Sequence, residues 1–247
     1  MLLEGRNAIV YGAAGSVGGA ISRAFGREGA RVFLAGRTLA TLDAVAAEIR
    51  EAGGQAETAV VDALDERSVD DHADAVGRVD VSVNVIADSD VQGTPMVEMS
   101  LQDYLSPVVT SVTSKFLTSR AAARRMVPRR SGVILAFGGT GDRGAHRAFH
   151  LGGLVTGFEA VEAMRRQLAA ELGPHGIRVL TLQTGGIPES IPAEHRADIE
   201  RVLTAQTLTG RTATLEDVGN LAVFAASDLA RTMTGTAINM SCGAVVD

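Results

Sequence analysis

Residues 7–20 read NAIVYGAAGSVGGA, a short apolar run that passes through a glycine-rich turn into a helical pattern. The apolar part, residues 7–11, predicts a strand buried on both faces, because it lacks polar alternation. Gly12, Gly15 and Gly18 would let the backbone turn tightly and approach a phosphate, and a helix that starts there offers free N–H groups. Glycine clusters are common in turns, so the position of this cluster directly after the first strand is what favours a dinucleotide site.

The same alternation continues along the chain. Further strand-like runs occupy residues 31–35, 57–61, 79–85, 132–137, 177–183 and 236–240. Apolar residues recur at helical spacing in residues 20–29, 38–54, 101–126 and 157–173. This alternation predicts an α/β fold, a doubly wound parallel sheet of seven strands with helices on both faces. Since no Pro/Ser-rich linker divides the chain, we expect one domain over residues 1–247.

Residues with special backbone preferences agree with these boundaries. Gly29, Gly53 and Gly173 follow predicted helix ends, where a left-handed residue commonly terminates a helix. Ser100 and Asp103 are spaced like a capping box, with Asp in place of the usual Glu or Gln. We therefore expect helices to end or begin at these positions.

The composition excludes several classes of protein. A net charge of −6 at pH 7 argues against nonspecific binding to nucleic acid, which needs a basic face. The sequence has no run of about 18 uncharged apolar residues, and Glu4 and Arg6 interrupt the start where a signal peptide would need one. The one cysteine, Cys242, suits a reducing compartment. We expect a cytoplasmic protein with no membrane or nucleic-acid partner.

The end of the second strand indicates which dinucleotide is bound. An NAD site usually has an acid there that binds the ribose 2′-hydroxyl. This chain instead has Gly36, Arg37 and Thr38. Arginine can bind a 2′-phosphate through two hydrogen bonds, so the sequence predicts NADP(H) in preference to NAD(H). The alternative is that Arg37 is a solvated residue of the helix's first turn.

These motifs resemble those of the short-chain dehydrogenase/reductase family over essentially the whole chain. Asp62 matches the family's aspartate after the third strand, which contacts adenine. Residues 80–87, DVSVNVIA, are similar to the family's Asp-x-x-Val-Asn-Asn-Ala-Gly, and residues 169–190 and 214–247 resemble its later segments. The resemblance implies a Rossmann-like fold and cofactor contacts at Gly12, Gly15, Ser16, Val17, Gly18, Arg37, Thr38, Asp62, Ala63, Asn84 and Ile187.

Several positions depart from the family's cofactor motifs. The middle glycine of the turn is Ser16, which could cap the helix and hydrogen-bond a phosphate. Val85 and Ala87 replace an asparagine and a glycine. Thr184 replaces the proline that precedes Gly185. Each change is compatible with binding in an altered geometry.

The departures at the catalytic positions are larger. In this family a tyrosine donates a proton, a lysine lowers the tyrosine's pKa, a serine orients the substrate and an asparagine holds a water. Alignment on Phe116 and on the pair at 157–158 places these roles on residues of other types: Ala148 (tyrosine), Gly152 (lysine), Gly139 (serine) and Ser111 (asparagine).

No shift of alignment restores the missing pair. The chain has two tyrosines, Tyr11 in the first strand and Tyr104 at the start of a helix, and one lysine, Lys115, within that helix. A Tyr-x-x-x-Lys motif therefore does not occur in any register.

Two histidines before residue 151 are weak substitutes for the missing acid. His146 and His150 are four residues apart and would share one face of a helix, which allows a metal interpretation. No acid or cysteine nearby completes a ligand set, so we expect no metal. A histidine has a pKa suited to proton transfer at neutral pH, and the remaining alternative is that both are solvated loop residues.

Two functional hypotheses follow from the resemblance. The chain could be an NADP(H)-dependent oxidoreductase with atypical chemistry, for example on a conjugated C=C bond, where protonation from water or His146 suffices. It could instead be a catalytically inactive nucleotide-binding pseudoenzyme that serves as a sensor or partner subunit. The resemblance also implies a substrate lid around residues 188–210 and a homo-oligomer, a tetramer or dimer. The sequence does not identify the small-molecule substrate.

Overall fold

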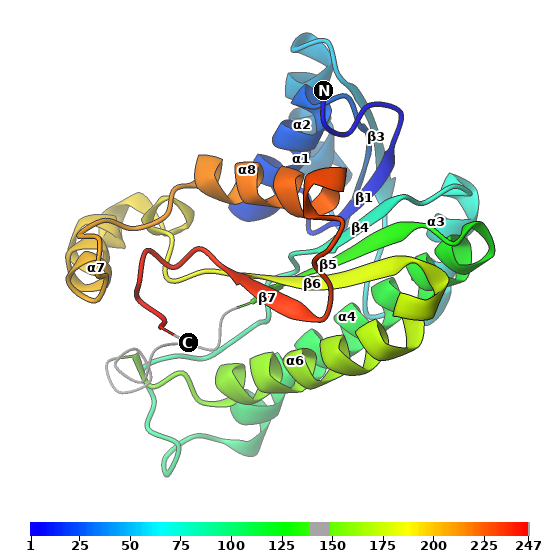
Figure 1. The fold of residues 1–247 in the computed structure, drawn as a ribbon. Helices are drawn as coiled ribbons and strands as arrows, with labels where there is room; N and C mark the ends of the chain where they lie inside the picture. The colour runs from blue at the N-terminus through cyan, green and yellow to red at the C-terminus, as the bar shows by residue number, and fades with distance from the viewer. Residues whose placement is uncertain (139–148, 247) are drawn as a thin grey trace.

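The computed structural model describes residues 1–138 and 149–246, and in this part of the chain seven parallel strands form one sheet (Figure 1). Their order across the sheet is β3-β2-β1-β4-β5-β6-β7. The strands are β1 Asn7–Tyr11, β2 Arg31–Gly36, β3 Gln55–Val60, β4 Val81–Asn84, β5 Gly132–Gly138, β6 Ile177–Gln183 and β7 Thr236–Asn239. The predicted fold class is therefore confirmed.

Helices cover both faces of the sheet (Figure 1). One layer contains α1 Ser16–Arg27, α2 Leu39–Glu51 and α8 Leu215–Ala226. The other contains α3 Glu66–Val76, α4 Leu101–Met126 and α6 Gly153–Leu172. Helix α7, Ala193–Ala205, lies outside both layers, and short 3-10 turns occupy Val127–Arg129, Gly173–His175, Pro188–Ser190 and Asp228–Ala230.

The strands alternate between two hydrophobic cores, one on each face of the sheet. In β1, Val10 packs toward the layer of α1, whereas Ile9 packs toward the layer of α4. Both faces are covered, so both sets must be apolar, which explains the continuous apolar runs in the sequence.

Element boundaries differ from the prediction where few apolar residues mark them. Asp65 is the N-cap residue of α3, and its carboxylate accepts from the Ser68 N–H, but the helix buries only Val69 and Ala73. Its helical periodicity is therefore weak in the sequence. Strand β4 is shorter than the predicted run, and α6 begins at Gly153, four residues earlier than predicted.

The predicted helix ends are confirmed at all three glycines, but the left-handed conformation expected of them is found at two and not at the third. Gly29 and Gly53 have φ values of 88° and 86°. Gly173 has φ −54° because the chain continues into a 3-10 turn, and Gly176, with φ 70°, takes the left-handed position. At the start of α4, the Ser100 hydroxyl accepts from the Asp103 N–H at 3.1 Å, as expected of its cap.

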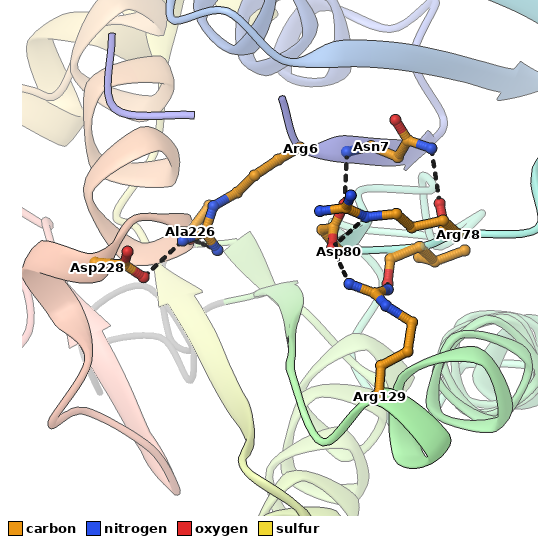
Figure 2. A network of polar contacts seen from close by, with 8 residues as sticks. Arg6, Asn7, Arg78, Asp80, Arg129, Ala226 and Asp228 are labelled. Carbon is orange, nitrogen blue, oxygen red and sulfur yellow. Dashed lines mark hydrogen bonds and ion pairs between the residues drawn. The ribbon is translucent and has the colours of Figure 1, made fainter. Parts of the chain in front are cut away.

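Asp80 joins the amino ends of β1 and β4, opposite the glycine-rich turn (Figure 2). Its carboxylate accepts from the Asn7 N–H at 2.9 Å, from Arg78 at 3.0 Å and from Arg129 at 2.5 Å. Burial raises the pKa of Asp80, but these hydrogen bonds outweigh it and hold the pKa below its ordinary value. This residue of the family motif therefore stabilises the fold.

Among the described helices, none is long and apolar enough to span a membrane.

Candidate functional site

A cavity of about 660 Å³ opens at the carboxyl ends of the strands, where the strand order reverses between β1 and β4. Ligands of open α/β sheets bind at this topological switch point. Segments that follow four different strands line the cavity: residues 15–18 after β1, 85–88 after β4, Gly138 at the end of β5 and 184–187 after β6.

The turn after β1 depends on its glycines. Gly12 has φ 83°, and a Cβ there would lie 2.9 Å from the Val85 carbonyl oxygen. A Cβ on Gly18 would collide with the carbonyl oxygen of Gly12. The backbone is therefore held close, with the amino end of α1 at the cavity, an arrangement that fits a pyrophosphate.

Ser16 does not cap α1, so that expectation is wrong. Gly15 is the N-cap residue, and no side chain caps the helix. Ser16 is the first helical residue, is exposed and lines the cavity together with Val17. Ser16 therefore belongs to the uncapped first turn of α1.

Arg37 and Thr38 follow β2, next to the glycine-rich turn. The turn is tied to β2 because the Gly12 N–H donates to the Ala35 carbonyl at 2.9 Å. Arg37 is exposed and forms no ion pair within the described residues. Thr38 is the N-cap residue of α2. Neither residue is among those that line the cavity, and within the described residues no ion pair would compete with a ligand for the Arg37 guanidinium.

Asp62 and Ala63 follow β3, at the carboxyl ends of the strands like the glycine-rich turn. The Asp62 carboxylate accepts from the Leu64 N–H at 3.0 Å, and its own N–H donates to the Ser68 hydroxyl at 3.1 Å. Ala63 is buried in the core beneath α3. Neither residue lines the cavity itself.

Asn84 is buried and supports the cavity from behind. Its side-chain amide donates to the Thr118 hydroxyl at 3.0 Å, and its oxygen accepts from the Ile86 N–H at 3.1 Å. These contacts fix residues 85–88 relative to α4. Ile187, by contrast, lines the cavity.

Of the four family catalytic positions, Gly139 and Ala148 lie outside the described residues, as does His146. Gly152 is the N-cap residue of α6, with φ 52° and ψ −126°. A Cβ there would lie 2.5 Å from Cε and 2.8 Å from Sδ of Met99. Met99 therefore fills the space that a side chain on Gly152 would need, and the backbone there has a conformation that side chains rarely adopt.

The tyrosines and His150 do not reach the cavity. Tyr11 is buried and packs edge-on against His72, with ring centroids 6.0 Å apart. The Tyr104 hydroxyl lies 3.0 Å from the Thr156 hydroxyl. His150 is exposed, with φ 47°, although its neighbours Phe149 and Leu151 line the cavity.

A buried ionic cluster beside the cavity was not predicted from the sequence. Lys115 Nζ lies 2.8 Å from Asp88 Oδ1, and the Ser111 hydroxyl donates to the same oxygen at 2.5 Å. Asp88 lines the cavity. The one available signal was that the chain's only lysine follows Ser111 by four residues, one helical turn.

The segment predicted as a lid forms one side of the cavity. Helix α7 buries none of its residues, yet Ile199 and Leu203 line the cavity. A Cβ on Gly186 would collide with the methyl groups of Leu203, so α7 rests directly on the loop that follows β6. Within the described residues, no group of three or more His, Cys, Asp or Glu side chains could hold a metal ion.

Comparison with known proteins agrees with this architecture. A family model described as enoyl-(acyl carrier protein) reductase matches residues 12–244. L-rhamnose 1-dehydrogenase (NAD(P)(+)) of Azotobacter vinelandii is 32% identical over 264 residues, covering 100% of this chain and 99% of the relative. D-threitol dehydrogenase of Mycolicibacterium smegmatis is 32% identical over 242 residues, covering 94% and 90%.

Solved structures are similar over the same extent. A short-chain type dehydrogenase/reductase from Mycobacterium marinum has a TM-score of 0.86 at 27% identity, covering 99% of this chain and 97% of its own. A candidate NAD(P)-dependent gluconate 5-dehydrogenase from Beutenbergia cavernae, with NADP bound at low occupancy, has a TM-score of 0.86 at 32% identity, covering 98% and 97%.

Proposed function

The chain belongs to the short-chain dehydrogenase/reductase family, and from this premise we propose that it is an NADP(H)-dependent oxidoreductase that works without the family's tyrosine and lysine. The observation that carries the proposal is the continuous cavity that joins the glycine-rich turn to the ends of β4, β5 and β6. When bound there, a nicotinamide supplies or accepts a hydride.

The chain's own residues would bind and orient the nucleotide. The turn at Gly12 and Gly18, with the amino end of α1, suits the pyrophosphate. Arg37, which is exposed and lacks an ion pair in the described part of the chain, suits a 2′-phosphate. Ile187 lies in the cavity wall, where it would exclude water from the nicotinamide.

For the substrate, we propose a neutral, polyhydroxylated small molecule. Two similar proteins are named for a sugar and a sugar alcohol, L-rhamnose and D-threitol. Among the described residues, those that line the cavity include the acids Asp88 and Asp90 but no lysine or arginine. An anionic substrate would meet repulsion from these carboxylates, whereas hydroxyl groups can donate to them.

The experiment is a turnover assay of the unmodified protein with NADP⁺ on D-threitol and L-rhamnose, and with NADPH on ketoses and a conjugated enone. Loss of a proton donor costs about 10²–10⁴ in rate. We therefore expect slow, NADP-linked turnover on the hydroxyl-bearing compounds. Fast reduction of the enone alone would move the proposal to C=C chemistry.

One observation favours the second candidate, a nucleotide-binding pseudoenzyme. Gly152, which we align with the family's lysine, has φ 52°, and Met99 fills the space that a side chain there would need, which supports a site that does not use that lysine. Saturable NADP⁺ binding with no turnover on the whole panel would support this candidate and exclude the first.

A further inference from the structure

The cluster of Asp88, Lys115 and Ser111 is the most deeply buried ionic group that reaches the cavity within the described residues. The side chains of Lys115 and Asp88 are 3% and 11% exposed, and Nζ lies 2.8 Å from Oδ1. A buried ion pair costs several kcal/mol of desolvation per ion, and an apolar pair of similar volume would usually be as stable. Stability alone therefore does not explain these charges in the wall of a cavity.

The geometry leaves one carboxylate oxygen for a ligand. Both Lys115 and Ser111 contact Oδ1 of Asp88. Within the described residues, Oδ2 has no hydrogen-bond donor. Lys115 and Ser111 come from α4, behind the cavity, whereas Asp88 itself lines it. The cluster thus holds a carboxylate in a fixed orientation, with its second oxygen available as an acceptor.

We propose that Asp88 is a ligand-binding residue whose Oδ2 accepts a hydrogen bond from a hydroxyl group of a neutral ligand, and that Lys115 and Ser111 position it. An ionised carboxylate only accepts hydrogen bonds, so its partner must be a donor. Asp90 lies in the same wall, which disfavours anions. The proposal rests on the proposed function for the use of the cavity, and it adds the group that recognises the ligand.

Two sources can supply such a hydroxyl group. One is the ribose of a bound nucleotide, since a carboxylate is the usual partner of ribose hydroxyls in dinucleotide sites. The other is a polyhydroxylated substrate. The chemistry at Asp88 is the same for both, and separate probes distinguish them.

The single lysine provides a direct probe that does not depend on turnover. Protein grown with ¹³Cε-labelled lysine gives one lysine side-chain NMR signal, that of Lys115. We would record it with NADP⁺ alone, with D-threitol alone and with both. A hydroxyl group that donates to Asp88 changes the charge distribution of the carboxylate that pairs with Lys115. The chemical shift of the lysine signal is therefore expected to change, and this change should saturate as the probe concentration rises.

Isosteric variants test the same contact by calorimetry. In Asp88→Asn an amide donor can face the cavity in place of the acceptor, and the affinity for the probe that shifts the lysine signal should fall about tenfold or more. Asp71→Asn, whose exposed carboxylate pairs with Arg67 and is not among the residues that line the cavity, is the isosteric control and should retain affinity. If Asp88→Asn does not fold, Ser111→Ala removes one bond to Oδ1 without altering charge and should weaken binding more mildly.

The outcomes separate the two proposals. A shift with NADP⁺ identifies the nucleotide ribose as the source, and a shift that requires D-threitol identifies the substrate. Binding of NADP⁺ by calorimetry with no lysine shift from any probe would overturn the role of Asp88 while leaving the proposed function intact. If NADP⁺ does not bind, the proposed function fails, and the D-threitol measurement alone then decides the role of Asp88.

Discussion

At the scale of single residues, Gly152 has a backbone and surroundings that leave no room for a side chain. The residue combines φ 52° with a neighbour, Met99, that a Cβ would meet at 2.5 Å. A lysine placed here would be strained before it reached any substrate. Restoring the family's residues one for one is therefore not expected to restore the family's geometry.

We predict that Gly152→Ala lowers the free energy of unfolding by about 1–3 kcal/mol, because alanine is disfavoured at positive φ and must displace Met99. Gly173→Ala is the control. Gly173 has φ −54°, and a Cβ there would meet no other atom within 4 Å, so alanine should be neutral or stabilising. Equal stability losses in both variants, measured by urea unfolding, would contradict this assignment.

Asp80 gives a prediction for acid stability. Its folded-state pKa lies below the ordinary value of 3.8, so the unfolded chain takes up a proton first as the pH falls. The stabilisation is therefore fully present above about pH 4 and is lost as the pH falls through the lower folded-state pKa. We expect Asp80→Asn to cost about 2 kcal/mol at pH 7 and progressively less below pH 4.

The measurement is urea unfolding of wild type and Asp80→Asn between pH 7 and pH 3. Asp71→Asn serves as the control, because its pair with Arg67 is exposed on both sides and should contribute about 0–1 kcal/mol. A constant difference between wild type and Asp80→Asn over the whole range would show that the carboxylate charge is not what stabilises the fold.

Residue-level prediction from the sequence was uneven for physical reasons. The turn glycines were predicted because steric limits on Gly12 and Gly18 act within one local segment. Asp88 and Lys115 are 27 positions apart and meet only because α4 packs behind the end of β4. Such a pair leaves no local pattern, so the buried ionic cluster of the cavity was missed.

At the scale of elements, α7 is the least anchored helix of the described residues that line the cavity. It buries none of its residues, and its Leu203 contacts Gly186 in the loop that follows β6. Few buried contacts are typical of segments that open locally. We therefore propose that α7 closes over a bound ligand, as expected of a lid.

We predict that Gly186→Ala displaces Leu203 and weakens ligand binding by favouring an open α7. Hydrogen exchange of α7 should become faster in the variant, whereas exchange in α4 should not change. The double variant Gly186→Ala with Leu203→Ala removes the collision between the two side chains. If the faster exchange of Gly186→Ala results from this collision, exchange in the double variant should be slower than in Gly186→Ala. Unchanged exchange in Gly186→Ala would indicate that α7 does not rest on this glycine.

The elements that the sequence predicted best are those buried on both sides. The strands of the central sheet were located because their apolar runs are continuous, and β1 sends Val10 and Ile9 into two different cores. Helix α3 exposes most of its surface, and its short apolar stripe of Val69 and Ala73 was too weak to predict its bounds. Burial alone does not decide this, since α8 buries Val218, Ala222 and Val223 and was not among the helical segments predicted.

At the scale of the whole molecule, the amino ends and the carboxyl ends of the parallel strands have different roles, and we call them the amino edge and the carboxyl edge of the sheet. The amino edge is held by Asp80 and by the pair of Arg6 with Asp228, at 2.6 Å, which joins β1 to the end of α8 (Figure 2). The carboxyl edge carries the cavity and the glycine-rich turn. Substitutions at the first edge should change stability, and substitutions at the second should change ligand binding.

The carboxyl ends of the strands are proposed to bind NADP(H), in preference to NAD(H), through Arg37, and this nucleotide binding is the central claim of the proposed function. The most direct test is an equilibrium titration of the protein with NADPH and with NADH, followed by the fluorescence of the bound nucleotide. We predict that NADPH binds about tenfold or more tightly than NADH, and that Arg37→Ala removes this difference without weakening NADH. Failure of both nucleotides to saturate, or equal affinity in the unmodified protein, would contradict the claim.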